Sequence, residues 1–186
     1  MSILDWIRVL EDFKRRGIKV IHRSALEAIY RGKDASLSVV INRLEKKGLV
    51  KRITKNWICI PPCEIWEIVK VVFPTAYISL EWALHYHEII DQEIKVITLV
   101  WPDKTRVVTN TYTFEIHKIS KRLYFGFNEK NIAEPEKALL DTIYIRKKPP
   151  PELNIELLNI NKLLNYAEKF PKKVRNNVHK LIKEQF

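Results

Sequence analysis

Side chains suited to contacts with nucleic acid gather between residues 31 and 55 of this 186-residue chain. At 100° per residue, the apolar stripe of a helix that follows Asp34 fixes which side chains point away from the core. The outward residues are Ala35, Val39, Asn42 and Lys46, with Ser38 and Arg43 on the flanks. Asn can bond adenine, Arg can bond guanine, and small apolar side chains can touch a thymine methyl group. This face therefore suits base readout.

A second set of cations nearby is better placed for phosphate groups than for base edges. Phosphate contacts position a protein on a duplex without reading its sequence. The set consists of Arg31, Lys33, Lys51, Arg52 and Lys55. The two sets together predict an interface with double-stranded DNA. The alternative is a similar fold used only for protein contact, with a solvated outer face.

Capped helices are predicted to precede the helix that carries this face. Ser2 followed by Asp5 predicts an N-cap with an acidic third position. A β-branched run at 18–21 predicts a short strand. Ser24 and Glu27 match a capping box, which predicts a second helix that ends at Gly32. Glycine is often the residue that directly follows the end of a helix.

The third helix and the segment after it complete the unit. Asp34 is its expected cap, and its apolar positions follow the i, i+3, i+4, i+7 pattern of Leu37, Val40, Ile41 and Leu44. Strand-like runs at 49–54 and 57–60 flank a Lys55-Asn56 turn, which predicts a β-hairpin with a basic tip. Helices followed by a basic hairpin give the order of a winged helix-turn-helix, and we assign this domain to residues 1–62.

Residues 63–186 are predicted to form an α/β domain with a small antiparallel sheet, so the fold class of the chain is α+β. Expected strands lie at 94–101, 106–109, 112–117 and 123–127. Ser79 is expected to cap one helix, and Pro135 is expected to open another that turns Ala138, Leu139 and Ile143 to a core.

The start of that second helix contains groups that are capable of acid–base chemistry. Glu134 and Glu136 flank Pro135 and lie beside Lys137. Carboxylates are favoured in the positive first turn of a helix, so capping accounts for them more simply than catalysis does.

The helical tail, residues 152–186, carries a polar outer face. Pro171 is expected to open the last helix, with Val174 and Val178 turned inward. The outward side chains are Lys172, Asn176, His179, Lys180 and Lys183. This face is either a solvated surface or a second face for an anionic partner.

Charge divides the chain into three parts. Residues 1–63 carry 14 basic and 6 acidic side chains, residues 64–143 carry 9 and 12, and residues 144–186 carry 10 and 4. The net charge of the whole chain is +11. Because residues 1–63 are strongly basic and residues 64–143 are slightly acidic, we expect residues 1–63 to bind a polyanion. Charge alone is equally compatible with solvated surfaces.

Several function classes are excluded by what the sequence contains. Its four glycines form no phosphate-cradling loop, and no catalytic motif or metal-ligand set is in view, so we expect neither an enzyme nor a cofactor. Cys59 and Cys63 are expected to be buried free thiols, not a disulfide framework or metal ligands. The absence of a long apolar run and of a signal peptide predicts a cytoplasmic protein without a membrane partner.

Two segments of the second domain resemble one known family. Residues 74–87, PTAYISLEWALHYH, and residues 133–141, AEPEKALLD, look like those of the AbiEi family of antitoxins and autoregulators from abortive-infection toxin–antitoxin operons. Glu88-Ile89 departs from the pattern, because many members have a glycine there. The resemblance implies a DNA-binding head that represses its own operon at an operator of inverted repeats. It also implies a second domain that neutralises an AbiEii-like nucleotidyltransferase toxin.

Two other functions remain open at this point. One is a winged-helix regulator whose second domain senses a small ligand and has no toxin. The other is an enzyme acting on nucleic acid, targeted by the winged helix, although the sequence lacks a dense carboxylate cluster for metal-dependent chemistry. A neighbouring gene for a nucleotidyltransferase would distinguish the antitoxin from the ligand sensor.

Overall fold

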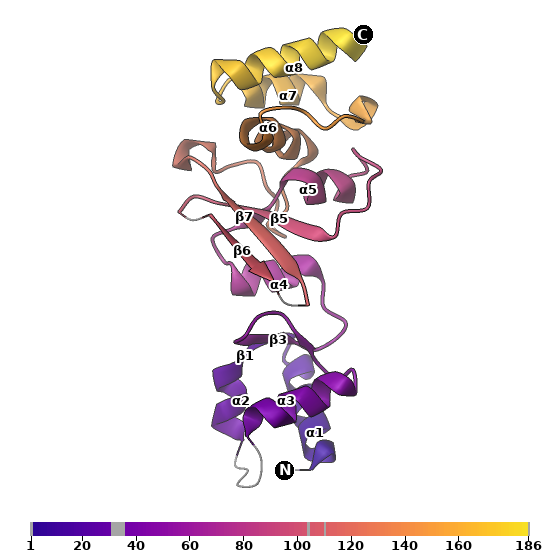
Figure 1. Cartoon of the computed structure of the whole chain (residues 1–186), viewed down its shortest axis with the longest axis vertical. Helices are drawn as coiled ribbons and strands as arrows, with labels where there is room; N and C mark the ends of the chain where they lie inside the picture. The colour runs from indigo at the N-terminus through magenta and orange to yellow at the C-terminus, as the bar shows by residue number, and fades with distance from the viewer. Residues whose placement is uncertain (1, 31–35, 104, 110, 186) are drawn as a thin grey trace. The chain divides into compact units, whose positions relative to one another are not determined.

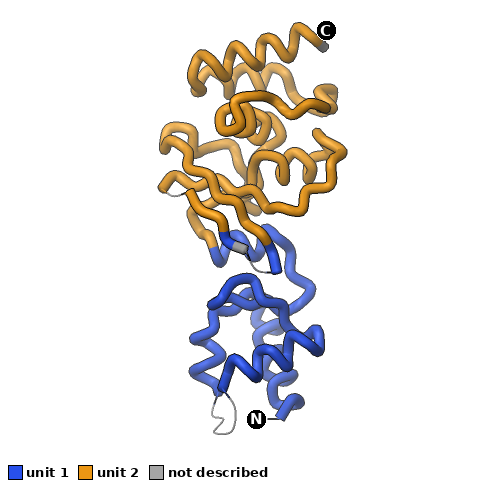
Figure 2. The backbone as a smooth tube through the Cα atoms, in the orientation of Figure 1, with its two compact units in different colours: residues 1–72, 108–112 blue, residues 73–107, 113–186 orange. Residues whose placement is uncertain are grey.

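The computed structural model describes residues 2–30, 36–103, 105–109 and 111–185. The chain divides into two compact units, which are residues 1–72 with 108–112 and residues 73–107 with 113–186 (Figure 2). We call them the N-terminal and the C-terminal unit. Each contains helices and a small sheet, so the predicted α+β class is confirmed (Figure 1).

The N-terminal unit is built on amphipathic helices. These are α1 (Ile3–Arg15), α2 (Arg23–Ile29), α3 (Leu37–Lys46) and α4 (Ile65–Val72). The capping box predicted for α1 is present, with Ser2 and Asp5 bonding each other's backbone. The first three helices bury Trp6, Leu26 and Leu44 in one core. The helical phase predicted for α3 is therefore confirmed.

A small antiparallel sheet lies in the same unit. Its strands are β1 (Val20–His22), β2 (Lys51–Arg52) and β3 (Trp57–Cys59), in the order β1-β3-β2. The pairing of Arg52 with Ile58 confirms the predicted hairpin. On its other edge β3 pairs with β1, which joins the hairpin to the strand predicted at 18–21.

Two helix starts differ from the prediction. The cap of α2 is His22, whose Nδ1 accepts from the backbone N–H of Ser24 at 3.3 Å. Glu27 does not close a capping box, because Arg23 on the preceding turn binds it at 2.8 Å. The N-cap of α3 is Ser36. The expected cap Asp34 and the expected stop Gly32 lie outside the described residues.

The cysteines form a disulfide, so the prediction of free thiols is wrong. Cys59 ends β3 and is fully buried, and the chain turns back through Pro61 and Pro62. This turn brings the Cα atoms of Cys59 and Cys63 to 6.5 Å, within the range that a disulfide spans.

The sheet of the C-terminal unit is mixed, and the prediction of an antiparallel sheet is wrong. Its strands are β4 (Tyr77–Ile78), β5 (Val96–Trp101), β6 (Arg106–Thr109) and β7 (Thr113–Lys118), in the order β4-β5-β7-β6. β4 pairs antiparallel with β5, but β5 and β7 are parallel. The chain returns along β6 at the edge of the sheet, and β7 then runs in the direction of β5.

The strand predicted at 123–127 is replaced by a short 3₁₀ helix, η1 (Lys121–Leu123), and an irregular segment. Its aromatic side chains pack in different directions and do not alternate across a sheet. Tyr124 and Phe127 both lie against the ring of Tyr77, while Phe125 lies edge-on to Tyr166.

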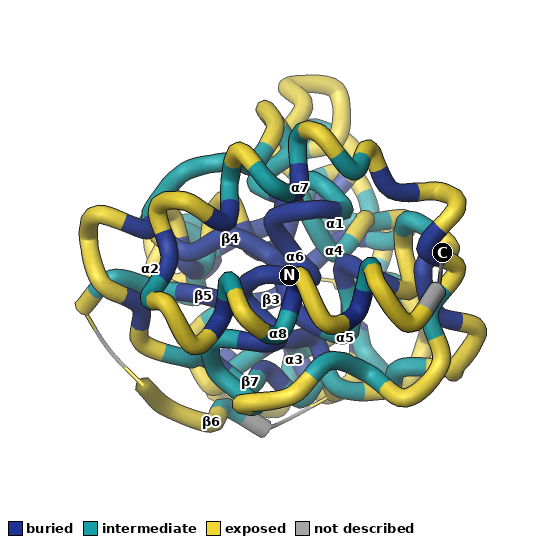
Figure 3. Tube along the Cα trace, turned by 90° about the horizontal axis from the view of Figure 1, so that it is seen from above, coloured by how far each residue is buried: buried dark blue, intermediate teal, exposed yellow. Residues whose placement is uncertain are grey.

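Helices of the C-terminal unit surround one central helix. They are α5 (Leu80–Tyr86), α6 (Pro135–Arg146), α7 (Ile160–Ala167) and α8 (Lys172–Gln185), with a short 3₁₀ helix η2 (Ile155–Leu157) before α7. Pro135 opens α6 as predicted. α6 contacts α5, α7 and α8, and it is buried from Glu136 to Ile143 (Figure 3). Ala138, Leu139 and Ile143 are buried as predicted, and the residues between them are buried as well. Within the described residues, no helix combines the length and apolarity that crossing a bilayer requires.

We predict that Leu44→Ala lowers the free energy of unfolding by about 2–5 kcal/mol. Leu44 is fully buried in the core beneath α3, so the substitution leaves a cavity there. Urea denaturation followed by circular dichroism measures the loss. Lys46→Ala, at an exposed position of the same helix, is the matched control. Equal stability of the two variants would show that the phase of α3 is wrong.

Candidate nucleic-acid interface

The outer face of α3 carries the polar side chains that the sequence predicts for base readout. Val39, Asn42, Arg43 and Lys46 are exposed, and Ser38 is half-buried. Val39 is 40% exposed, although it is apolar. Ala35 of the base-reading set, and Arg31 and Lys33 of the phosphate-binding set, lie outside the described part of the chain.

Contacts between α3 and the rest of the core fix the orientation of this face. Leu37, Ile41 and Leu44 lie on the opposite side of the helix and are buried. They belong to one cluster with Trp6 from α1 and Ile58 from β3. The outward direction of Asn42 and Lys46 is therefore set by apolar packing.

The hairpin is bound to α3 through Arg52. Its Nη2 donates to Asn42 Oδ1 at 2.5 Å, and its backbone N–H donates to Glu45 Oε1 at 3.0 Å. Its Nε lies 3.5 Å from Glu45 Oε2. Sequence reasoning placed Arg52 with the phosphate contacts, but in the structure its guanidinium holds the hairpin against the helix. A carbonyl oxygen has two lone pairs, so Asn42 keeps one acceptor site and both amide donors.

Four other predicted cations of this surface are described by the structure. Arg43, Lys46, Lys51 and Lys55 are all exposed, and none of them makes an ion pair within the described ranges. An unpaired exposed cation can meet a phosphate without first breaking a contact inside the protein. The structure thus brings together base-reading side chains on α3 and cations on the adjoining hairpin.

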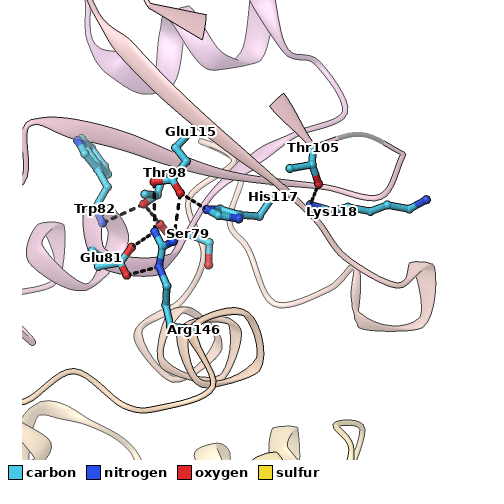
Figure 4. A network of polar contacts seen from close by, with 9 residues as sticks. All are labelled: Ser79, Glu81, Trp82, Thr98, Thr105, Glu115, His117, Lys118 and Arg146. Atoms are coloured by element: carbon cyan, nitrogen blue, oxygen red, sulfur yellow. Dashed lines mark hydrogen bonds and ion pairs between the residues drawn. The ribbon is translucent and has the colours of Figure 1, made fainter. Parts of the chain in front are cut away.

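The C-terminal unit contains a polar network that sequence reasoning missed. Arg146, in the last turn of α6, lies between Glu81 on α5 and Glu115 on β7 (Figure 4). Its Nε is 2.8 Å from Glu81 Oε1, and its Nη1 is 3.1 Å from Glu115 Oε1. His117 Nε2 also lies 2.9 Å from Glu115 Oε1. One guanidinium therefore joins two helices to the sheet.

The charges of this network shift one another's pKa values. The hydrogen bonds that Arg146 donates to the carboxylates of Glu81 and Glu115 raise the pKa of Arg146, and those that Glu115 accepts lower the pKa of Glu115. Burial lowers the pKa of His117, against the opposing effect of the Glu115 carboxylate. Both carboxylates are thus bound by the same guanidinium, which is typical of a structural network.

The N-terminus of α5 is capped by the side chain of Thr98 on β5, not by that of Ser79. Ser79 is its N-cap, as predicted, but its hydroxyl makes no capping bond. Thr98 Oγ1 on β5 accepts from the backbone N–H of Trp82 at 3.1 Å and donates to the Ser79 carbonyl at 2.6 Å (Figure 4). Because Thr98 supplies the cap, the Ser79 hydroxyl is free for another partner.

That partner belongs to a fully buried ion pair on α6. Ser79 Oγ donates to Asp141 Oδ2 at 2.8 Å, and Tyr77 Oη donates to the same oxygen at 2.9 Å. Lys137 Nζ forms a short hydrogen bond with the other carboxylate oxygen and lies 2.8 Å from Tyr77 Oη. Neither charged side chain is exposed to solvent.

Aromatic rings enclose the lysine of this pair. Its Nζ is 5.1 Å from the ring centroid of Tyr77, 5.3 Å from that of Phe125 and 5.4 Å from that of Phe170. Burial lowers the pKa of Lys137, while the adjacent carboxylate opposes this change. Burial and the same carboxylate raise the pKa of Tyr77. We interpret the cluster as structural, since each of its polar side chains bonds to another member of the cluster.

Gly126 allows this lysine to fit. A Cβ at this position would lie 3.1 Å from Lys137 Cγ and 3.2 Å from Tyr166 Cε2. The residue also has φ +73°, which favours glycine. The i, i+4 spacing of Lys137 and Asp141 was visible in the sequence, but this spacing is far more common on solvated helix faces.

Metal binding is not indicated by the described residues. Among them, no group of three or more His, Cys, Asp or Glu side chains could hold a metal ion.

Comparison with known proteins gives a fold relative. No family model matches the chain, and no curated protein matches it. Among solved structures, the RV2827C protein from Mycobacterium tuberculosis has a TM-score of 0.62 at 12% sequence identity, and the match covers 95% of this chain and 75% of that chain. At this identity the likeness shows that the fold is shared and carries no statement about function.

We predict that Lys137→Met lowers the free energy of unfolding by about 3–5 kcal/mol, because it leaves the buried Asp141 carboxylate without its cation. The double variant Lys137→Met, Asp141→Leu should regain most of this loss. Urea denaturation of the single and double variants measures the coupling. Additive losses from the two substitutions would contradict the assignment of the pair as a coupled unit.

Proposed function

We propose that the N-terminal unit is a winged helix-turn-helix that binds double-stranded DNA. The observation that carries this proposal is the joint exposure of Asn42, Arg43 and Lys46 on one face of α3, beside a hairpin with free lysines. The high positive charge of residues 1–63 supports it, since a basic surface raises the encounter rate with a polyanion.

In this proposal α3 enters the major groove. Asn42 reads adenine through its amide, and Arg43 reads guanine through its guanidinium. Val39 supplies an apolar contact for a thymine methyl group. Lys51 and Lys55 on the hairpin bind phosphates on the flank, and Arg52 fixes the hairpin and the Asn42 amide in place. In this arrangement α3 recognises the bases, and the hairpin binds the phosphates that position the protein on the duplex.

We further propose that the protein is the autorepressor and antitoxin of a toxin–antitoxin operon. The support is the resemblance of residues 74–87 and 133–141 to the AbiEi family. The two segments contact each other, because Tyr77 and Ser79 of the first bond to Lys137 or Asp141 of the second. The resemblance therefore concerns residues that meet in the core of the C-terminal unit. Since α6 is buried over 136–143, toxin contacts belong on other surfaces of the C-terminal unit.

We predict that Asn42→Ala or Arg43→Ala weakens binding to the DNA upstream of the gene by about 1–3 kcal/mol and relaxes the preference at particular base pairs. Lys51→Ala and Lys55→Ala should weaken binding to all duplexes alike and reduce its salt dependence. Gel-shift titrations against a panel of single-base operator variants separate the two effects. Lys95→Ala, an exposed lysine of the C-terminal unit, is the control. The assignment fails if both classes of variant respond in the same way.

We predict that the full chain restores growth to cells that express the nucleotidyltransferase encoded beside its gene. The double variant Asn42→Ala, Lys55→Ala should restore growth equally well, because the substitutions lie outside the C-terminal unit. Colony counts with soluble expression confirmed provide the measurement. A soluble wild-type chain that gives no rescue would overturn the antitoxin role and favour a regulator that senses a ligand.

A further inference from the structure

A basic groove runs along α8 in the C-terminal unit. Two adjoining hollows of about 140 and 150 Å³ lie between α8 and the chain that leaves α6. Lys147 and Asn177 line both hollows, so the two hollows adjoin each other, and we call them together the groove. α8 packs on α6 and α7, and it buries Val174, Val178 and Leu181; Val174 and Leu181 also line the hollows.

Lysines line this groove from both sides. Lys173 and Lys180 come from α8, and Lys147 and Lys148 come from the segment that follows α6. Lys148 and Lys173 are exposed and make no ion pair within the described parts of the chain. Lys180 lies 3.6 Å from Glu184, which also lines the groove. The balance of charge favours an anionic ligand.

Lys147 occupies a position that normally belongs to glycine. It ends α6 with φ 68°, in the left-handed region. Its Nζ donates to the Tyr144 carbonyl at 2.6 Å and lies 5.0 Å from the centre of the Tyr144 ring. An ammonium group has three donors, so two remain for a ligand. The backbone at this position is strained for a lysine, and the Lys147 side chain lines both hollows.

The first hollow has the size and lining of a site for one planar ring. Its walls include Tyr144, Pro171 and Val174, with Lys147, Lys173 and Asn177 around them. An apolar cavity of about 150 Å³ is known to hold benzene, and this hollow has about 140 Å³. The Asn177 amide offers both a donor and an acceptor to a ring edge.

We propose that this groove binds single-stranded nucleic acid, with one base in the hollow beside Tyr144 and phosphates on the lysines. Duplex bases are stacked inside the helix and do not reach such a hollow, whereas a single strand offers its bases to aromatic side chains. The exposed lysines from Lys172 to Lys183 extend over about 16 Å of α8, more than one nucleotide needs. This site is independent of the DNA face on α3.

Binding of a fluorescent 12-nucleotide oligothymidylate to the full chain at low salt tests the proposal. Lys173→Glu with Lys180→Glu should weaken binding at least tenfold and leave the affinity for the operator duplex unchanged. Asn177→Phe, which fills the hollow without changing charge, should weaken oligothymidylate binding with an unchanged salt dependence. Lys147→Gly should weaken binding while the Tm stays equal or rises, because glycine suits this backbone position.

Lys95→Ala is the control for loss of one positive charge in the same unit. The α3 variant Asn42→Ala should change duplex binding alone, so failure of the DNA-binding proposal and failure of this one are distinguishable. Oligothymidylate binding that is equal for wild type and the Lys173→Glu, Lys180→Glu variant overturns the proposal. Competition by polyglutamate as effective as that by unlabelled oligothymidylate also overturns it and indicates an acidic protein partner.

Discussion

The burial of α6 on all sides from Glu136 to Ile143 is the constraint on which the C-terminal unit depends. A helix in this position has no solvent for its charged side chains, so Lys137 and Asp141 need partners inside the protein. β4 and the start of α5 supply them through Tyr77 and Ser79. Thr98 then takes over the capping of α5, which leaves the Ser79 hydroxyl available for the carboxylate.

The cations of the protein fall into two groups, those bound by other side chains and those exposed to solvent without an ion pair in the described part of the chain. In the C-terminal unit Arg146 binds carboxylates on α5 and β7, and Lys137 binds Asp141 of its own helix and Tyr77 of β4. On α3 and the hairpin, Arg52 has a similar bracing role, since it holds Asn42 and Glu45. Lys46, Lys51 and Lys55 are exposed and unpaired in the described part of the chain. Fixed cations thus shape the surface, and free cations are left to meet phosphates.

Local patterns predicted the N-terminal unit well. The apolar spacing from Leu37 to Leu44 fixed the phase of α3, and the basic turn at Lys55 marked the hairpin, because neighbouring residues determine both features. Features that depend on distant residues were missed. The parallel pairing of β5 with β7 requires knowing that β6 lies at the edge of the sheet. The bond between Arg52 and Asn42 likewise depends on how the hairpin meets the helix.

Burial of charge was the hardest feature to predict. Lys137 and Asp141 have the i, i+4 spacing of an ordinary surface pair, and Glu136 beside them was interpreted as a carboxylate in the first turn of a helix. Their burial depends on Gly126, which leaves room for the lysine, and on aromatic side chains from three separate segments. None of these residues is adjacent to Lys137 or Asp141 in the sequence. The disulfide between Cys59 and Cys63 was missed for a similar reason, because it depends on a turn through two prolines.

The most direct test of DNA recognition by α3 is an equilibrium titration of the full chain at several salt concentrations. The two ligands are the duplex from upstream of its gene and a scrambled duplex of equal length and composition. We expect the logarithm of each association constant to fall linearly with the logarithm of salt concentration, and the upstream duplex to bind at least about 10³-fold more tightly. Equal affinities for the two duplexes, or affinities independent of salt, would contradict the account.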